Sequence, residues 1–377
     1  MPELRKAAPA VAAVAAVAAV VLACGALSLT GAVGVTGVVG VAARAASVTD
    51  GSAPVGWIPP RFEVPRAETN LGPALTELAV AGGKQETALF WAGPRVGASG
   101  SEISYETSGD LGQDIWSPVG IVPGEGQTGK AAITNRRPSA APFSTAPEPE
   151  AIVAWEGADD QRVWYSVGVV VPSGRLTWPG GARTVPGAFT SSGPTVFSLL
   201  YSDSVFVTWE AAGGHQVSYI VGQIKGNSIR WGAVSRIPGA DTTSAPSVAE
   251  ARTGPGQGQL YVFWRAPGGK ITGARTADLP PRGVAQWTPL RSALASGAGP
   301  AVAAIGSGNS YPLLVVYRAV KGSELLYATL NATGQLRHER AWIVPKLRSQ
   351  DSPALNPQIL AATDPGYIYY VRVCAGC

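Results

Sequence analysis

The stretch LYVFWRAPGG at residues 260–269 runs from apolar side chains to one charge and then to a turn. Tyr, Val, Phe and Trp favour β-strands, and Pro-Gly-Gly favours a turn. The stretch therefore predicts a strand that ends in a turn, and the same phrase returns five times along the chain. Its relatives are ALFWAGP (88–94), AIVAWEG (151–157), VFVTWEA (206–212), LLVVYRA (313–319) and YIYYVR (367–372).

The repetition has a regular period. The aromatic residues that close the first five phrases are Trp91, Trp155, Trp209, Trp264 and Tyr317. A second tryptophan series runs alongside, and ten of the eleven tryptophans belong to one series or the other. The second series consists of Trp57, Trp116, Trp178, Trp231, Trp287 and Trp342. Successive members of the first series are 64, 54, 55 and 53 residues apart. A nearly constant spacing of this size indicates a repeat architecture such as a solenoid or a propeller.

Two further marks accompany the phrase. A proline-containing mark precedes each of the six copies, and a short β-like run follows the first five. The preceding marks are LGP (71–73), SAAP (139–142), SSGP (191–194), SAPSVA (244–249), GAGPAVA (297–303) and SPAL (352–355). The following runs are ISYE (103–106), VWYSVG (163–168), VSYIVG (217–222), ITGA (271–274) and LLYAT (325–329). Each unit thus holds four short strands, which is the composition of a propeller blade.

We therefore expect an all-β, six-bladed β-propeller of four-stranded antiparallel blades. The chain begins with a fourth strand at Trp57 and ends with a second strand at 366–372. A closed ring accounts for both ends, since the last blade would take its first two strands from the C-terminus and its last two from the N-terminus. The third strand of that blade is predicted at 42–50. Closure removes open strand edges that would otherwise invite aggregation.

Residues 1–43 form a separate segment ahead of the propeller at 44–377. Arg5 and Lys6 are followed by an uncharged apolar run at 7–43, which is typical of an export signal or a membrane-spanning helix. Three fates stay open: cleavage near Ala46, retention as a single N-terminal transmembrane helix, or lipidation at Cys24. Each predicts an extracellular or cell-surface propeller, because basic residues stay on the cytoplasmic side.

Composition excludes several classes of function. The formal net charge of +4 over 377 residues does not indicate nucleic-acid binding. The only two histidines, His215 and His338, are interpreted as solvated turn residues. So few histidines predict neither a metal site nor a Ser-His-Asp triad, and no motif predicts a cofactor. Cys374 and Cys377 close the chain and are predicted to form a small disulfide loop.

The strand order resembles two families of extracellular propellers, the fucose-binding lectins and the sialidase-like propellers with Asp-box repeats. Ser108 to Trp116 is similar to an Asp-box, with one residue too many before the tryptophan, and it occurs in one unit only. The lectin resemblance would require an Arg on the second strand and a Glu on the third, but no third-strand Glu recurs. The resemblance implies an extracellular glycan-binding fold and carries over no fucose site.

Candidate ligand residues follow from the geometry expected of a propeller. The residue that ends each second strand should lie on the same face as the links between blades, and loops on a rigid scaffold carry function. The extra segment GEGQTGKAAITNRRP (124–138) is predicted on that face too. The candidates are Glu156, Glu210, Arg265, Arg318, Arg372, Arg136 and Arg137.

The function expected from the sequence is that of a binding module for an extracellular or cell-surface glycan or protein. Two alternatives stay open: a structural or interaction protein of the cell envelope without a small ligand, and a sialidase-like glycoside hydrolase. The hydrolase would need clustered arginines and carboxylates, and the scattered acids give no visible pair. Binding is therefore favoured over hydrolysis, and enzymatic activity stays open.

Overall fold

The computed structural model describes a set of residues that covers most of the repeats. They are 38–45, 55–57, 63–64, 69, 71–79, 85–95, 100–109, 116–125, 130–143, 150–171, 173–199, 202–226, 228–254, 257–281, 285–304, 312–336, 341–348, 352–355 and 367–373. These residues form strands, turns and bends, with no α-helix among them. In this part of the chain no helix is both long and apolar enough to cross a membrane.

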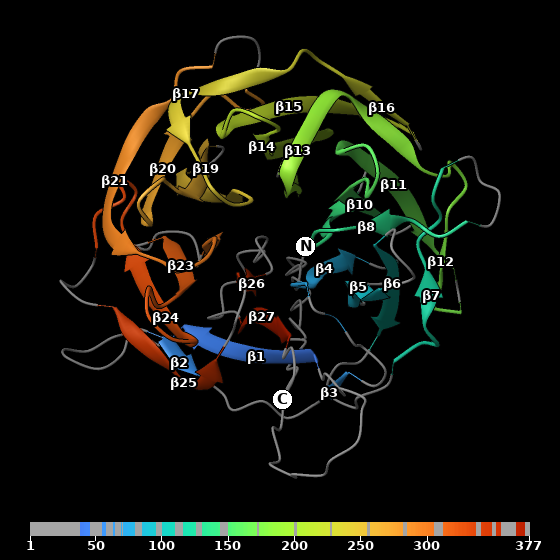
Figure 1. Ribbon diagram of the computed structural model, residues 1–377, viewed down its shortest axis with the longest axis horizontal. Helices are drawn as coiled ribbons and strands as arrows, with labels where there is room; N and C mark the ends of the chain where they lie inside the picture. The colour runs from blue at the N-terminus through green and yellow to red at the C-terminus, as the bar shows by residue number, and fades with distance from the viewer. Residues whose placement is uncertain are drawn as a thin grey trace, which may run out of the picture.

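Antiparallel sheets stand around a common centre, as Figure 1 shows. The first sheet has the order β4-β5-β6-β7, with β8 also paired to β6. Consecutive strands are neighbours, which is the meander of a propeller blade. The strands are β4 (Ala74–Ala79), β5 (Gln85–Arg95), β6 (Ser101–Ser108), β7 (Gly120–Ile121) and β8 (Ile133–Thr134).

The next sheet has nine strands because one long strand joins two repeats. β13 (Arg183–Ser198) pairs with β11 through its first half and with β14 through its second half. The strands before it are β9 (Ser139–Phe143), β10 (Glu150–Glu156), β11 (Arg162–Val170) and β12 (Leu176–Thr177). Those after it are β14 (Ser204–Ala211), β15 (Gln216–Lys225), β16 (Ser228–Trp231) and β17 (Ser235–Asp241).

Two four-stranded sheets follow, each in plain chain order. The first contains β18 (Ser247–Gly254), β19 (Gln257–Arg265), β20 (Lys270–Thr276) and β21 (Thr288–Ala295). The second contains β22 (Ala301–Ala304), β23 (Leu313–Arg318), β24 (Glu324–Leu330) and β25 (Trp342–Arg348). The stretch LYVFWR lies on β19, a second strand, as predicted.

The two ends of the chain share the last sheet, whose order is β2-β1-β27-β26 with β3 also paired to β1. β1 and β27, blue and red in Figure 1, are antiparallel neighbours over seven residue pairs, from Val38 opposite Val373 to Arg44 opposite Tyr367. The predicted pairing of terminal strands is therefore present. The strands are β1 (Val38–Ala45), β2 (Val55–Trp57), β3 (Glu63–Val64), β26 (Ala354–Leu355) and β27 (Tyr367–Val373).

One predicted position in this sheet was wrong. The third strand was expected at 42–50, but β1 begins at Val38 and ends at Ala45. Its partner β27 is seven residues long, and in the observed register the last residue of β27, Val373, lies opposite Val38. The residues from 38 to 43 had been assigned to the N-terminal segment. Residues 1–37, with the predicted helix and Cys24, lie outside the described residues.

The core consists mainly of second strands that are buried on both faces. Every residue of β10 is buried, and so is every residue of β14 except its last. The aromatic residues of the first series are all buried: Trp91, Trp155, Trp209, Trp264 and Tyr317. A strand covered on both sides by neighbouring sheets has no polar face, which explains the uninterrupted apolar phrase.

The second tryptophan series packs one sheet against the next. Trp178 lies edge-on to Tyr105, Trp231 to Tyr165 and Trp287 to Tyr219, with ring centroids 5.3–5.7 Å apart. Trp178 directly follows β12, Trp231 ends β16 and Trp287 directly precedes β21, and in each pair the tyrosine belongs to the third strand of the preceding repeat. The two aromatic series thus hold different layers of the core together.

Candidate functional site

A short segment leads into each first strand, and we call it the link. It reads Thr or Ser, three variable residues and Pro. The links are 69–73, 134–138, 190–194, 242–246, 296–300 and 349–353. In the five whose first residue is described, that hydroxyl residue is buried. Thr134 and Thr242 each donate to the carbonyl two residues on and accept from that residue's N–H. Such turns fix the chain direction.

Sequence reasoning missed this motif and misplaced one of its copies. It set SAAP (139–142) beside LGP and SSGP, but Ser139 lies opposite Ala154 just as Ala74 lies opposite Phe90. The proline that corresponds to Pro73 is therefore Pro138, within Arg136-Arg137-Pro138. The sixfold spacing of Thr or Ser and Pro was the signal that could have found it.

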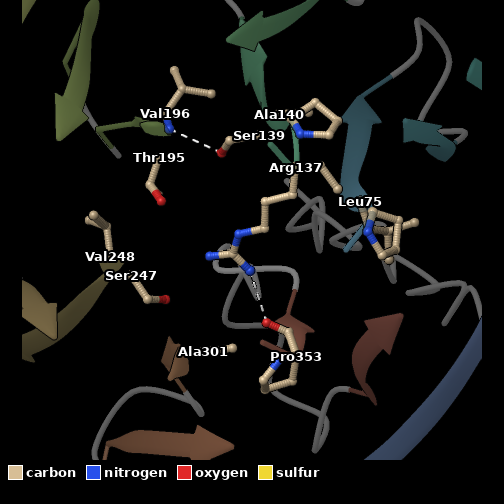
Figure 2. A pocket seen from close by; sticks show the side chains of 13 residues that line it. Leu75, Arg137, Ser139, Ala140, Thr195, Val196, Ser247, Val248, Ala301 and Pro353 are labelled. Carbon is tan, nitrogen blue, oxygen red and sulfur yellow. Dashed lines mark hydrogen bonds between the residues drawn. The ribbon is translucent and has the colours of Figure 1, made fainter. Parts of the chain in front are cut away.

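The first strands converge on a small axial opening at the ends where they leave the links. Figure 2 shows this opening, which is lined by 13 residues from the starts of six strands or links. Neighbouring first strands are joined there by side-chain hydrogen bonds. The N–H of Val196 donates to Ser139 Oγ at 3.0 Å, Thr195 Oγ1 donates to the Pro246 carbonyl at 2.5 Å, and the N–H of Val302 donates to Ser247 Oγ at 2.9 Å.

Arg137 is the one large residue at its position in the links. The residue before the link proline is small elsewhere: Gly72, Gly193, Ala245, Gly299 and Ser352. At Gly299 a Cβ atom would lie 2.9 Å from Ser352 Oγ and 3.0 Å from Ser244 Oγ. Crowding thus explains the small residue at Gly299, while at Gly193 a positive φ of 88° favours glycine. Arg137 departs from this pattern of small residues.

The Arg137 side chain reaches across the opening. Its Nη1 donates to the carbonyl of Pro353 at 3.1 Å, a bond between residues 216 positions apart (Figure 2). About 50 Å³ of space is left beside it, room for a few water molecules or one small group but not for a whole sugar ring. None of the 13 lining residues is Asp or Glu.

Two of the predicted ligand residues are buried glutamates at the ends of second strands. The Glu156 side chain is 5% exposed, and its Oε2 lies 3.4 Å from Nε of Arg136 in the preceding link, whose side chain is 50% exposed. Glu210 is also 5% exposed and lies 2.6 Å from Nδ1 of His215 in the following turn. His215 is exposed, as predicted, but its contact with Glu210 was not foreseen.

Burial changes the acidity of Glu156. Desolvation raises its pKa to about 7, against the opposing attraction of the Arg136 guanidinium and with a small addition from the nearby Asp160 carboxylate. Loss of hydration destabilises the charged form, so the carboxyl titrates near neutral pH. Glu156 therefore acts as a titratable contact between its strand and the link.

The corresponding residues of the next two sheets are arginines that hold links. Arg265 donates from Nε to the Ser296 carbonyl at 2.8 Å and from Nη1 to Thr243 Oγ1 at 2.6 Å. Arg318 donates from Nη2 to the Gly297 carbonyl at 2.5 Å. The structure thus gives both arginines contacts inside the protein, and Arg265 joins its own link to that of the following sheet.

Strand pairing also corrects the alignment of Arg372. Arg265 and Arg318 stand two residues beyond the partners of Ser247 and Ala301. In the last sheet the partner of Ala354 is Val371, so the same position is occupied by Val373 and not by Arg372. The side chain of Arg372, His338 and the pair Cys374 and Cys377 lie outside the described residues.

The insertion at 124–138 lies in a different place from the one predicted. It separates β7 from β8, so most of it interrupts the outer strand of the first sheet. Gly124 donates its N–H to the Lys130 carbonyl, and Glu125 bridges to Ala182 of the neighbouring repeat. Only its end, the link with Arg136 and Arg137, reaches the face of the axial opening.

Among the described residues, no group of three or more His, Cys, Asp or Glu side chains is placed to hold a metal ion. The site is therefore built from one axial arginine, a rim of internally bonded charges and the hydroxyls that join first strands. Such an arrangement can bind an acidic or polar group at the axis. The described side chains bring no pair of exposed carboxylates together there.

Comparison with known proteins defines the fold. No protein-family model and no curated protein sequence matches the chain. The α-L-arabinanase of Penicillium chrysogenum, solved with arabinobiose, is 12% identical with a TM-score of 0.52, over 80% of this chain and 93% of that one. The GH93 α-L-arabinofuranosidase of Fusarium graminearum, also with arabinobiose, is 14% identical with a TM-score of 0.51, over 80% and 92%.

A Hadza microbial sialidase is 13% identical with a TM-score of 0.51, over 81% of this chain and 65% of that one. Identities this low establish the fold alone. The chain has a β-propeller fold similar to those of these three enzymes, which confirms the propeller expected from its sequence.

Proposed function

We propose that this chain is an exported six-bladed propeller that binds an extracellular or cell-surface glycan at the face of the axial opening, without hydrolysing it. Six blades are supported by the six links, by the division of the nine-stranded sheet at β13, and by the sheet that both chain ends share. Export is supported by the apolar run at 7–43. The similar arabinanase, arabinofuranosidase and sialidase support a carbohydrate ligand.

The observation that carries the proposal is the position of Arg137. Its guanidinium lies where first strands from all around the ring meet, at a position that is small in every other link. A side chain that departs from the repeat at the axis is not needed to build the repeat. A cation in a narrow opening favours a ligand that presents an acidic group.

The acids nearby support binding without hydrolysis by the two-carboxylate route. Most glycoside hydrolases use two carboxyl groups about 5–10 Å apart, on either side of the scissile bond, whereas sialidases use a tyrosine nucleophile. The glutamates of this face, Glu156 and Glu210, are nearly buried and already contact Arg136 and His215. No acidic side chain lines the described axial opening.

A glycan array probed with the purified chain in detergent micelles tests the proposal. We expect selective binding of glycans that carry acidic groups, and Arg137→Gln should weaken it about tenfold or more, the effect of losing one charge-assisted hydrogen bond. Arg175→Gln removes an exposed arginine far from the links and serves as the matched control. Equal binding by both variants, or no glycan binding at all, would rule the axial site out.

The hydrolase alternative has its own readout. Fluorogenic sialosides and arabinosides should give no product above the buffer rate with the parent chain. Turnover that Glu156→Gln or Glu210→Gln abolishes would replace the binding proposal with catalysis. The location is tested separately, since added protease should digest the propeller on intact cells if the chain is exported.

A further inference from the structure

A second cavity lies away from the axis, between the nine-stranded sheet and the sheet that follows it. It is formed by β15, β16, the bend at 232–235 and the turn that contains Pro280 and Pro281. β15 to β17 and β20 to β21 are neighbours around the ring in Figure 1. The cavity has a volume of about 390 Å³, which is within the range of about 300–1,000 Å³ that small-molecule sites occupy. We call it the lateral groove.

Strand pairing decides which side chains face the lateral groove. Gln223 lies opposite Arg230, and Tyr219 lies opposite Ser235. Residues directly opposite one another point to the same face of a sheet. Tyr219 packs against Trp287 of the next sheet with ring centroids 5.5 Å apart. The face that carries these four residues therefore looks toward the groove.

Trp231 also lines the groove, but its side chain points to the opposite face of the sheet from Arg230. It lies opposite Gly222 and packs against Tyr165 of the preceding repeat at 5.3 Å. Its ring thus belongs to the core between the earlier sheets, and a ligand in the groove meets its strand rather than its aromatic face. The apolar wall comes from Val221, Pro280 and Pro281.

The polar wall of the groove carries an exposed cation. Arg230 and Gln223 are both exposed, and no acidic side chain of the described residues lies within ion-pair distance of Arg230. A guanidinium binds a carboxylate through paired N–H donors, and an amide can both donate to and accept from hydroxyls. Pro280, which is partly exposed, adds an apolar ring to the lining, while Pro281 is buried beneath it in the same turn.

We propose that the lateral groove is a second ligand site, separate from the axial opening, and that it binds an acidic saccharide such as a uronate oligomer. Arg230 would bind the carboxylate, Gln223 the neighbouring hydroxyls, and Pro280 with Val221 the apolar face of the sugar ring. A sugar acid carries a carboxylate, hydroxyls and an apolar face on one ring, and the volume of the groove is within the range of small-molecule sites. The site does not depend on Arg137.

Isothermal titration of the full chain in detergent micelles, at low ionic strength, tests the groove with two matched probes. Trigalacturonate carries three carboxylates, and galactotriose has the same linkage without them. We expect trigalacturonate to bind at least about tenfold more tightly than galactotriose, and added salt to weaken it. Arg230→Gln should reduce the affinity for trigalacturonate by about tenfold, and Gln223→Ala should reduce it less.

Arg236→Gln is the matched control. Arg236 is an exposed arginine on the adjoining strand β17, and its pairing with Ser218 places it on the face away from the groove. We expect its substitution to leave the binding of trigalacturonate unchanged. Equal losses in the Arg230 and Arg236 variants, equal binding of the two probes, or no binding of trigalacturonate would each overturn the proposal. If Arg137→Gln were the only variant to lose binding of trigalacturonate, the ligand would bind at the axial opening and not in the lateral groove.

Discussion

Charged residues of opposite sign occupy equivalent positions at the ends of second strands, and all of them make contacts inside the protein. Glu156 and Glu210 end two second strands, while Arg265 and Arg318 end the next two. Three of the four contact a link, and Glu210 contacts the turn beside it. The two arginines donate to link carbonyls and to a link hydroxyl, whereas each glutamate contacts a basic side chain, Arg136 or His215. These residues therefore belong to the scaffold around the axial opening.

The titration of Glu156 should make the stability of the propeller depend on pH. Its folded pKa of about 7 exceeds the ordinary value of 4.5, so the folded state binds more protons between these two values. Its contribution to stability is greatest below about pH 4.5, falls as the pH rises to about 7, and then levels off. Glu156→Gln should remove this decline and gain roughly 1–3 kcal/mol over the parent at pH 8.

Urea melts of both proteins between pH 4.5 and 8 measure this difference. The matched control is Glu324→Gln, because Glu324 is an exposed acid at the start of β24. A parent and a Glu156→Gln variant whose stability curves stay parallel across the range would show that burial does not control this carboxyl.

The link threonines should matter more than their exposed counterparts. Thr242 Oγ1 donates to the Ser244 carbonyl at 2.7 Å and accepts from the Ser244 N–H at 3.2 Å. Thr242→Val keeps the shape but leaves these backbone groups without their partner, at a cost of about 1–3 kcal/mol. Thr288→Val, at an exposed position of β21, should change stability by less than about 0.5 kcal/mol. Equal melting midpoints for the two variants would show that the hydrogen bonds of Thr242 do not stabilise the fold.

At the scale of elements, the fourth strand of one sheet is held by the third strand of the sheet before it. Trp287 contacts Tyr219 and Phe206, with ring centroids 5.5 and 6.5 Å apart. The next copy differs, because Gly273 stands where the other third strands carry tyrosine. Its Cβ position is filled by Phe263 and by the Val262 carbonyl. Trp342 instead stacks on Tyr327 of its own sheet at 5.5 Å.

Truncation of the two tryptophans should therefore have unequal effects. Trp287→Ala removes a packed contact between sheets and should cost about 3–5 kcal/mol. Trp342→Ala removes a pair within one sheet and should cost less. Thermal melts of the two variants compare them directly, and a larger loss for Trp342→Ala would contradict the role assigned to the second tryptophan series.

At the scale of the whole molecule, the pairing of β1 with β27 joins the two ends of the chain. Seven residue pairs connect strands that are more than 300 residues apart in the sequence. Arg137 adds a second long-range contact, to Pro353 at the start of the same sheet. Each contact closes a long loop of the chain, and the entropy lost in closing that loop opposes formation of the contact. The last sheet is thus the place where the fold depends most on long-range contacts.

Deletion of residues 38–64 tests this dependence. It removes β1, β2 and β3 and leaves β27 without its partner, so the chain should unfold or aggregate through the bare edge. Deletion of residues 1–37 is the control, because it leaves every described strand intact, and it should give a folded protein. If the 38–64 deletion melts like the control, the joining of the chain ends is not required for the fold.

Much of the fold could be predicted because its signals are local and recur. The apolar phrase that ends at Trp264 and the tryptophan at 287 each indicate burial between sheets. The repetition of both along the chain indicates a propeller. The site was less predictable. Arg137 and its neighbour Arg136 were both named as candidates, but nothing in the pair indicated that one would cross the axis and the other would contact Glu156. The lateral groove was not predicted at all, because its walls come from β15, β16 and a turn about 50 residues later.

The sequence by itself determined the class of element and the repetition. Apolar runs, turn residues and the spacing of tryptophans act over a few residues, so they can be read without coordinates. Only the tertiary structure decided the register of the last sheet, the choice of Val373 over Arg372 at the second-strand end, and the meeting of Arg137 with Pro353. Those outcomes depend on which strands pair and on how closely six first strands converge, and both are set by contacts between residues far apart in the chain.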